Sequence, residues 1–236
     1  MNKIEQKVIN SSNFYSSSFL NFDFKLAEFG YKTIKPFFCC KKALELGPAS
    51  GFMTKNLVND FEKLDLIEGS KELLDQIPNY KNIFKFHSLF ENFETDEQYD
   101  TIIMAHVLEH IKNPVAILKK IHTWLSNSGI FIISVPNAKS LHRLAAVKMG
   151  LLASEYQLNS RDHQLGHYRV YDLETLENHA KEANFKIIKK GGYFLKPISN
   201  GQIDIQWNES MIEAFYNLGF DFEENCAEIY IVCQKK

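Results

Sequence analysis

Hydrophobic positions along the chain alternate between short apolar runs and longer stretches with helical spacing. The apolar runs predict buried strands at residues 42–46, 63–67, 83–87, 99–105, 130–135, 185–189 and 227–232. Helical spacing predicts helices at residues 21–35, 52–61, 70–77, 114–125, 173–183 and 209–218. Strands that alternate with helices across short links are typical of a doubly wound α/β domain.

This alternation predicts a Rossmann-like, mostly parallel sheet of seven strands with an antiparallel last strand. The rhythm is interrupted once, at residues 137–170, where we expect an inserted and partly helical segment. We interpret the 236 residues as a single domain, with residues 1–40 as an N-terminal capping segment.

Composition narrows the class of protein. The chain is 45% hydrophobic with a formal net charge of -2, which suits a globular protein and disfavours a generic nucleic-acid binder. It has no 18-residue apolar run and no signal-peptide pattern, so we expect a cytoplasmic protein without a membrane span. The four cysteines form no C-x-x-C pair, and reduced, mostly buried thiols are expected.

A glycine-rich turn follows the first predicted strand, in the run Glu45-Leu46-Gly47-Pro48-Ala49-Ser50-Gly51. Ligands of doubly wound sheets bind at the carboxyl ends of strands, and glycines there allow close approach to the backbone. Glu68 ends the second strand and could accept hydrogen bonds from both ribose hydroxyls. The dinucleotide pattern G-x-G-x-x-G fails at Ala49 and Phe52, and there is no P-loop sequence.

The stretches ALELGPASG, IEGS and YDTIIMAHVLEHIKNPVAILKKIHTWLSNSGIFIISVPN resemble the class I S-adenosylmethionine-dependent methyltransferases. The resemblance is close over residues 43–137, and GHYRVYDLETLENHAKEANF extends it more weakly. The resemblance is to the small-molecule type of this family, similar to bacterial quinone-precursor and sugar methyltransferases. The family pattern [DE]-x-G-x-G-x-G has alanine here at its middle glycine. The resemblance implies that S-adenosylmethionine is the methyl donor and S-adenosylhomocysteine the product.

The resemblance also implies which residues hold the cofactor. Gly47, Ala49 and Gly51 would line its methionine part, Glu68 would hold the ribose, and Ser88 and Leu89 would flank the adenine. Ala105 and His106 would lie near the sulfonium, with Glu45 and Gly69 completing the set. Serine at position 88, where relatives often carry aspartate, leaves the adenine contact open.

His106-Val107-Leu108-Glu109-His110 also matches the H-x-x-E-H pattern of one group of zinc peptidases. Those enzymes carry both histidines on one continuous helix. Here a strand ends at Ala105 and a new helix starts at Pro114, so a zinc hydrolase is disfavoured and no metal is expected. The resemblance places this run in the loop after the fourth strand, where His110 is either a loop anchor or a catalyst.

The inserted segment 137–170 follows the fifth strand, at the edge where a methyl acceptor should bind. We interpret it as an acceptor lid. His163 and His167, together with His106, are candidate catalytic bases, while Arg143, Arg161, Tyr168 and Arg169 are candidate substrate-binding residues. An ordinary charged, solvated segment explains the same residues about equally well.

The three arginines of the segment are the only arginines in the chain, which favours a small anionic acceptor with a hydroxyl or amine. A sugar or a phosphorylated metabolite is the preferred prediction. The alternative is a regulatory protein on the same fold that binds the cofactor without catalysis. The sequence leaves the oligomeric state open.

Overall fold

The structure, a computed structural model, describes residues 21–236, and seven of its strands form one sheet. These strands are β1 (Lys42–Leu46), β2 (Lys63–Glu68), β3 (Ile83–His87), β4 (Tyr99–Ala105), β5 (Leu125–Pro136), β6 (Phe185–Tyr193) and β7 (Glu228–Lys235). Their order is β3-β2-β1-β4-β5-β7-β6, and only β7 runs antiparallel to its neighbours. The predicted doubly wound sheet with an antiparallel last strand is confirmed.

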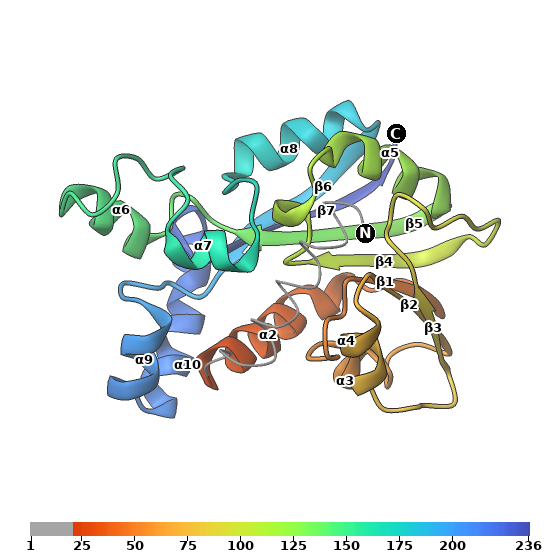
Figure 1. Cartoon of the computed structure of the whole chain (residues 1–236), viewed down its shortest axis with the longest axis horizontal. Helices are drawn as coiled ribbons and strands as arrows, with labels where there is room; N and C mark the ends of the chain where they lie inside the picture. The colour runs from red at the N-terminus through yellow and green to blue at the C-terminus, as the bar shows by residue number, and fades with distance from the viewer. Residues whose placement is uncertain (1–20) are drawn as a thin grey trace.

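Helices cover both faces of this sheet (Figure 1). They are α2 (Asn21–Ile34), α3 (Thr54–Leu57), α4 (Lys71–Gln76), α5 (Pro114–Trp124), α6 (Leu141–Lys148), α7 (Ser160–Leu165), α8 (Leu173–Glu182), α9 (Asn200–Gln206) and α10 (Glu209–Leu218), with short 3-10 turns at Lys35–Phe37, Leu108–His110, Gly219–Asp221 and Glu223–Asn225. Figure 1 shows α5 and α8 on one face and α2, α3 and α4 on the other, while α6, α7, α9 and α10 gather at one end.

Each face of the sheet has its own apolar core. On the α5 and α8 face, Trp124 and Leu176 are buried against the strands. On the α2 face, Phe22, Leu26 and Phe29 are buried, as the helical spacing predicted. Residues 1–20 of the predicted capping segment lie outside the described part of the chain.

The structure differs from the sequence prediction in several elements. The helix predicted at 52–61 contracts to α3, because the amides of Asn59 and Asp60 bond to carbonyls three residues back and form turns. Strand β5 begins at Leu125 instead of 130 and passes through Gly129, where a Cβ would lie 2.9 Å from a backbone carbonyl. Helix α9 was not predicted from its polar sequence; a capping box between Ser199 and Gln202 starts it.

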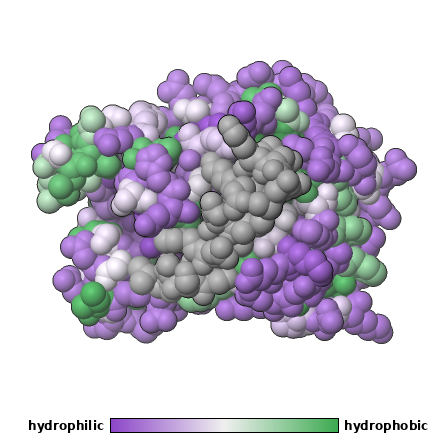
Figure 2. Space-filling model, viewed as in Figure 1, coloured by the Kyte–Doolittle hydropathy of each residue, from purple (hydrophilic) through white to green (hydrophobic). Residues whose placement is uncertain are grey.

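The segment 137–170 extends beyond the sheet as α6, α7 and their connecting loops. Figure 2 shows apolar side chains gathered at the outer end of α6, where Met149 is 71% and Leu151 is 67% exposed. Among residues 21–236, no helix combines the length and the apolar character needed to cross a membrane.

Candidate active site

The sheet has its switch point between β1 and β4. These strands are parallel neighbours, with Leu46 opposite Met104, so their carboxyl ends lie side by side. The chain continues to β2 on one side and to β5 on the other, and ligands of such sheets bind at this crevice. A cavity of about 470 Å³ opens there, between the glycine turn, α2 and the segment 137–170.

The glycine turn has a backbone that favours glycine. Gly47, Ala49 and Gly51 have φ values of +65°, +49° and +88°. Alanine is strained in this left-handed region, and such strain concentrates at functional sites. A Cβ on Gly47 would lie 2.5 Å from Val107 Cγ2, so the loops after β1 and β4 are in close contact. Gly47 and Ala49 both line the cavity.

Glu68 ends β2 beside this turn. Its Oε2 accepts a hydrogen bond from the Ala49 amide at 3.1 Å, and its Oε1 accepts one from the Ser70 amide at 2.9 Å. The Ser88 amide donates to the Glu68 carbonyl at 3.1 Å, which places the start of the loop after β3 next to β2. The open glycine turn and this adjacent carboxylate fit the nucleoside part of the implied cofactor. Gly51, Glu68, Gly69, Ser88 and Leu89 lie outside the cavity lining itself.

Glu45 is a buried carboxyl at the end of β1, and it lines the cavity. The Thr54 hydroxyl donates to Glu45 Oε2 at 2.7 Å. Burial raises the pKa of Glu45 to about 7, and the nearby Glu68 adds to the rise. A carboxyl with this pKa is ready to ionise when a cationic group binds beside it.

Glu45→Gln is expected to stabilise the ligand-free protein at pH 8. Burial raises the pKa of the Glu45 carboxyl from 4.5 in the unfolded state to about 7 in the folded state. Such a group contributes stability at pH values below its pKa in the unfolded state. That contribution is lost as the pH rises through its pKa in the folded state. The full shift from 4.5 corresponds to about 3 kcal/mol at pH 8. Urea unfolding at pH 5 and pH 8 should show a smaller change in the free energy of unfolding for Glu45→Gln than for wild type. The exposed Glu62→Gln is the control, and its change should equal that of wild type. Equal profiles for wild type and Glu45→Gln would contradict the assignment.

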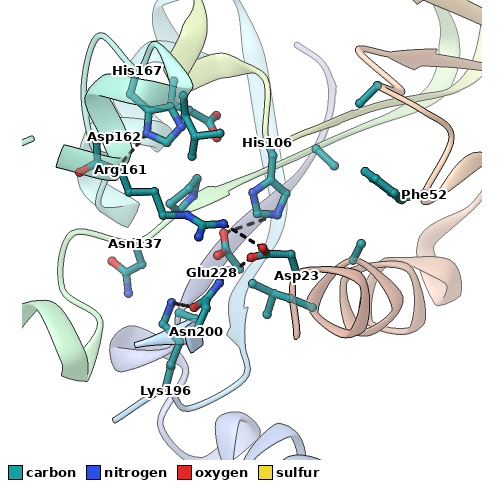
Figure 3. Close-up of a pocket in the computed structure, with 18 of the residues that line it drawn as sticks. Asp23, Phe52, His106, Asn137, Arg161, Asp162, His167, Lys196, Asn200 and Glu228 are labelled. Carbon is teal, nitrogen blue, oxygen red and sulfur yellow. Dashed lines mark hydrogen bonds and ion pairs between the residues drawn. The ribbon is translucent and has the colours of Figure 1, made fainter. Parts of the chain in front are cut away.

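His106 directly follows β4 and has the left-handed φ of +55°. Its amide donates to the Ser134 carbonyl at 2.9 Å, which fixes the loop to β5. The ring turns into the cavity, and its Nε2 lies 3.6 Å from Glu228 Oε2 (Figure 3). Burial lowers the pKa of His106, so the imidazole is neutral near pH 7 and can accept a proton. Ala105, the preceding residue, also lines the cavity.

The two histidines of the HVLEH run point in different directions. His106 faces Glu228, whereas the His110 ring packs edge-on against His167 with centroids 4.7 Å apart. The possible metal-ligating atoms of Glu109, His110 and His167 lie within 4.8 Å of one another. His106 is not part of this group. The run therefore lacks the arrangement of a zinc peptidase, in which both histidines of the pattern hold the ion.

Arg143 is buried and bonded within the segment 137–170. Its guanidinium donates to the Glu155 carbonyl at 3.0 Å, to the Gln157 carbonyl, and to Asp162 Oδ2 at 3.1 Å. These bonds join α6 to α7 and the loop between them. Arg143 borders the cavity, but its donors serve the shape of the segment.

The other two arginines also have protein partners. Arg161 pairs with Asp23 at 2.8 Å and so connects α7 to α2 across the cavity (Figure 3). Arg169 donates to the carbonyls of Ile111 and Lys112, the latter at 3.0 Å, and does not line the cavity. The arginines therefore hold the loops around the cavity together, and the structure gives no separate support for an anion site.

The remaining candidate residues of the segment 137–170 differ in their burial and in whether they line the cavity. His167 is buried and lines the cavity, and its Nδ1 lies 3.1 Å from Asp162 Oδ1. His163 is exposed and Tyr168 is 38% exposed, and neither lines the cavity. Of the three candidate bases, only His106 and His167 thus reach the same space.

A chain of buried and half-buried polar residues lines the side of the cavity opposite the glycine turn, and sequence reasoning missed it. Lys196 Nζ donates to Asn200 Oδ1 at 2.7 Å, and Asn200 Nδ2 donates to Asp23 Oδ1 at 2.7 Å (Figure 3). Burial lowers the pKa of Lys196 and raises that of Glu228. One signal was available: Glu228 is an acid inside an otherwise apolar strand, where charge is unusual.

Four buried polar atoms in the cavity wall have no hydrogen-bond partner among residues 21–236. They are Glu109 Oε2, His142 Nδ1, Tyr193 Oη and Glu228 Oε2. Unpartnered buried polar atoms are uncommon because each costs about 1–3 kcal/mol. Their concentration around one cavity indicates that a polar ligand completes the site.

Together, a doubly wound sheet, a glycine turn and an acidic residue after β2 define a nucleotide-type cofactor domain. The family described as "Methyltransferase domain" matches residues 25–190. The chain belongs to this family, and the resemblance seen in residues 43–137 is confirmed.

Individual relatives agree with this assignment. A ubiquinone biosynthesis O-methyltransferase of Rickettsia bellii is 28% identical over 120 residues, covering 49% of this chain and 48% of the relative. An (S)-coclaurine N-methyltransferase of Papaver somniferum is 32% identical over 78 residues, covering 33% of this chain and 21% of the relative. The chain thus spans about half or less of the length of these curated relatives.

Solved structures share the fold. A Thermotoga maritima protein described as a SAM-dependent methyltransferase, possible histamine N-methyltransferase, has a TM-score of 0.70 at 16% identity, covering 98% of this chain and 100% of that one. The DhpI-SAH complex has a TM-score of 0.62 at 12% identity, covering 98% of this chain and 96% of that one.

Proposed function

We propose that this protein transfers a methyl group from S-adenosylmethionine to a hydroxyl or amine of a small polar acceptor. The observation that carries the proposal is one cavity that joins the glycine turn to His106 and to the unpartnered polar atoms beyond it. When bound, S-adenosylmethionine supplies a methyl group already attached to a sulfonium leaving group. The protein's main task is then to align the acceptor and take up its proton.

The cofactor would be held by the turn after β1 and by Glu68. Gly47 and Ala49 present open backbone to the cavity, and Glu45 offers a carboxyl to a cationic group. Glu68 lies beside them, where it can exchange its present amide bonds for ribose hydroxyls. Ser88, after β3, would flank the adenine, as the family resemblance implies.

His106 is the residue placed to take the acceptor's proton. As the acceptor oxygen or nitrogen gains the methyl group, it loses a proton, and His106 Nε2 faces the cavity in its neutral form. Glu228, 3.6 Å away, stabilises the resulting imidazolium. Lys196 favours the ionised form of Glu228 and opposes the effect of burial. His167, held by Asp162, shapes the wall behind the acceptor.

The acceptor class follows from the free polar atoms. Two of the four belong to the carboxyls of Glu109 and Glu228, whose unpartnered oxygens can accept hydrogen bonds from a ligand. A sugar, another polyol or an amine supplies such donors, whereas a phosphorylated metabolite would bring acceptors to them. Since the arginines have protein partners, we favour the neutral or cationic acceptor over the anionic one. Location in the cytoplasm stays a prediction.

The proposed function is tested by offering the purified protein S-adenosylmethionine with panels of sugars, polyols, amines and sugar phosphates. S-adenosylhomocysteine release above the acceptor-free rate identifies active compounds. We expect release with donor-rich compounds. No release with any panel, despite tight cofactor binding, would instead support a regulatory protein that binds the cofactor without catalysis.

Glu228→Gln is expected to lower kcat/KM for an active acceptor about 10–100-fold. The substitution removes a charge-assisted contact to protonated His106, and such contacts contribute about 1.5–3 kcal/mol. The cofactor Kd should stay unchanged, because Glu228 lies on β7, away from Glu68. Calorimetry for the cofactor and initial rates for the acceptor separate the two effects, with the exposed Glu182→Gln as the matched control. An equal loss of cofactor affinity would assign Glu228 to the cofactor site instead.

A further inference from the structure

Two consecutive cysteines lie outside the active site, between the 3-10 turn Lys35–Phe37 and β1. The Sγ atoms of Cys39 and Cys40 are 3.0 Å apart, and both residues are free thiols. Cys40 is exposed and Cys39 is half-buried, so only Cys226 and Cys233 fulfil the expectation of buried thiols. The pair is therefore accessible from solvent through Cys40.

Hydrogen bonds fix the backbone on either side of the two cysteines. The Cys39 amide donates to Thr101 Oγ1 at 2.9 Å, and that hydroxyl donates back to the Cys39 carbonyl at 2.7 Å. Cys40 has the left-handed φ of +56°, uncommon for a residue with a side chain. On the other side, the Lys41 carbonyl accepts hydrogen bonds from the Glu62 and Lys63 amides at 2.9 and 3.1 Å. The backbone that carries the two sulfurs is thus fixed by neighbouring strands.

A disulfide between adjacent residues differs from an ordinary structural disulfide. Cα atoms joined by a trans peptide bond are about 3.8 Å apart, whereas disulfides usually span about 4.4–6.8 Å. A bond formed at the shorter spacing carries strain, and strained or exposed disulfides are readily reduced. Such a bond would form and break in response to thiols and disulfides in solution.

We propose that Cys39 and Cys40 form a reversible modification site for small-molecule disulfides. The Cys40 thiolate attacks one sulfur of the small disulfide and releases one small thiol. The Cys39 thiolate then attacks the Cys40 sulfur of this mixed disulfide and releases the second small thiol. Two protein thiols are oxidised to one disulfide, the small disulfide is reduced to two thiols, and the two cysteine protons go to solvent or to the released thiolates.

The order of attack follows from the environments of the two sulfurs. The neighbouring Cys40 sulfur and partial burial raise the pKa of Cys39 to about 11, which disfavours its thiolate. Cys40 is the sulfur that a solution oxidant reaches first. The pair precedes β1, while the active site follows it, and a five-residue strand separates them by about 15 Å. The site is therefore independent of the proposed methyl transfer.

The test is oxidised glutathione added to the folded, reduced protein, followed by intact mass spectrometry and peptide mapping. Wild type should lose two hydrogens, carry no lasting glutathione, and return to the reduced mass with excess reduced glutathione. Cys39→Ser should instead keep one glutathione on Cys40, because the second attack is missing. Cys226 and Cys233 should stay unmodified in both proteins, since both are buried.

Two results would overturn the proposal. One is a lasting glutathione adduct on wild-type Cys40, which would mean that Cys39 cannot complete the exchange. The other is an unreacted pair in wild type while Cys40 of Cys39→Ser reacts. Phenylarsine oxide gives a second readout on the same proteins. A vicinal dithiol binds it through both sulfurs, so wild type should retain it after washing with a monothiol and Cys39→Ser should lose it.

Discussion

Replacing His106 with asparagine is expected to lower kcat for methyl transfer about 10²–10⁴-fold, the usual contribution of a general base. His106 Nε2 faces the cavity beside Glu228, and burial keeps the ring neutral near pH 7. Asparagine is the informative replacement because it tolerates the left-handed φ of +55° at this position. The cofactor Kd and the melting temperature should therefore change little, and single-turnover rates with a known acceptor measure the loss.

The pH profile gives an independent check on His106. Because burial lowers the pKa of His106, its neutral form persists to lower pH than that of an ordinary histidine. Wild-type kcat/KM should therefore fall only at pH values below about 6.5. That acidic limb should disappear in His106→Asn. His163→Asn is the matched control, since His163 is exposed and outside the cavity. A normal rate for His106→Asn would remove His106 from the mechanism.

Gly47→Ala is expected to weaken cofactor binding at least tenfold and to lower the free energy of unfolding by about 3 kcal/mol. The added Cβ would lie 2.5 Å from Val107 Cγ2, and φ is +65°. One of the two loops must therefore move, and both loops line the part of the cavity where we propose that the cofactor binds. Calorimetric titration with S-adenosylhomocysteine and urea unfolding measure the two effects.

Two further variants separate the clash from the backbone strain. Gly150 has a similar φ of +72° with open space around it, so Gly150→Ala should cost only about 1 kcal/mol and leave cofactor binding intact. Adding Val107→Ala to Gly47→Ala removes the contacted methyl group and should restore part of the affinity. If Gly47→Ala behaves like Gly150→Ala, the close contact between the two loops is not needed for binding.

The parts of the fold that depend on local pattern could be predicted from the sequence. Apolar runs such as 99–105 became strands with the expected bounds, and Ser70 and Asn113 cap their helices as turn chemistry requires. The glycine turn and Glu68 were recognisable because strand ends of a doubly wound sheet meet at one edge.

The acceptor side depends on contacts that a sequence does not display. Asp23, Lys196 and Glu228 come from α2, the chain after β6, and β7, and they meet only because β7 inserts between β5 and β6. The arginines show that residue type alone does not predict a contact. Their presence in one segment favoured anion binding, yet Arg143 and Arg169 donate to backbone carbonyls. Composition cannot distinguish these two uses of a guanidinium.

The most direct test of the account follows a tritiated methyl group from S-adenosylmethionine in a small-molecule extract incubated with wild type and Glu68→Ala. We expect wild type to move the label into small polar compounds and Glu68→Ala to leave it on the donor, because we propose that Glu68 holds the ribose. Label that stays on the donor with wild type, or that moves into protein or nucleic acid, would contradict methyl transfer to a small acceptor in this cavity.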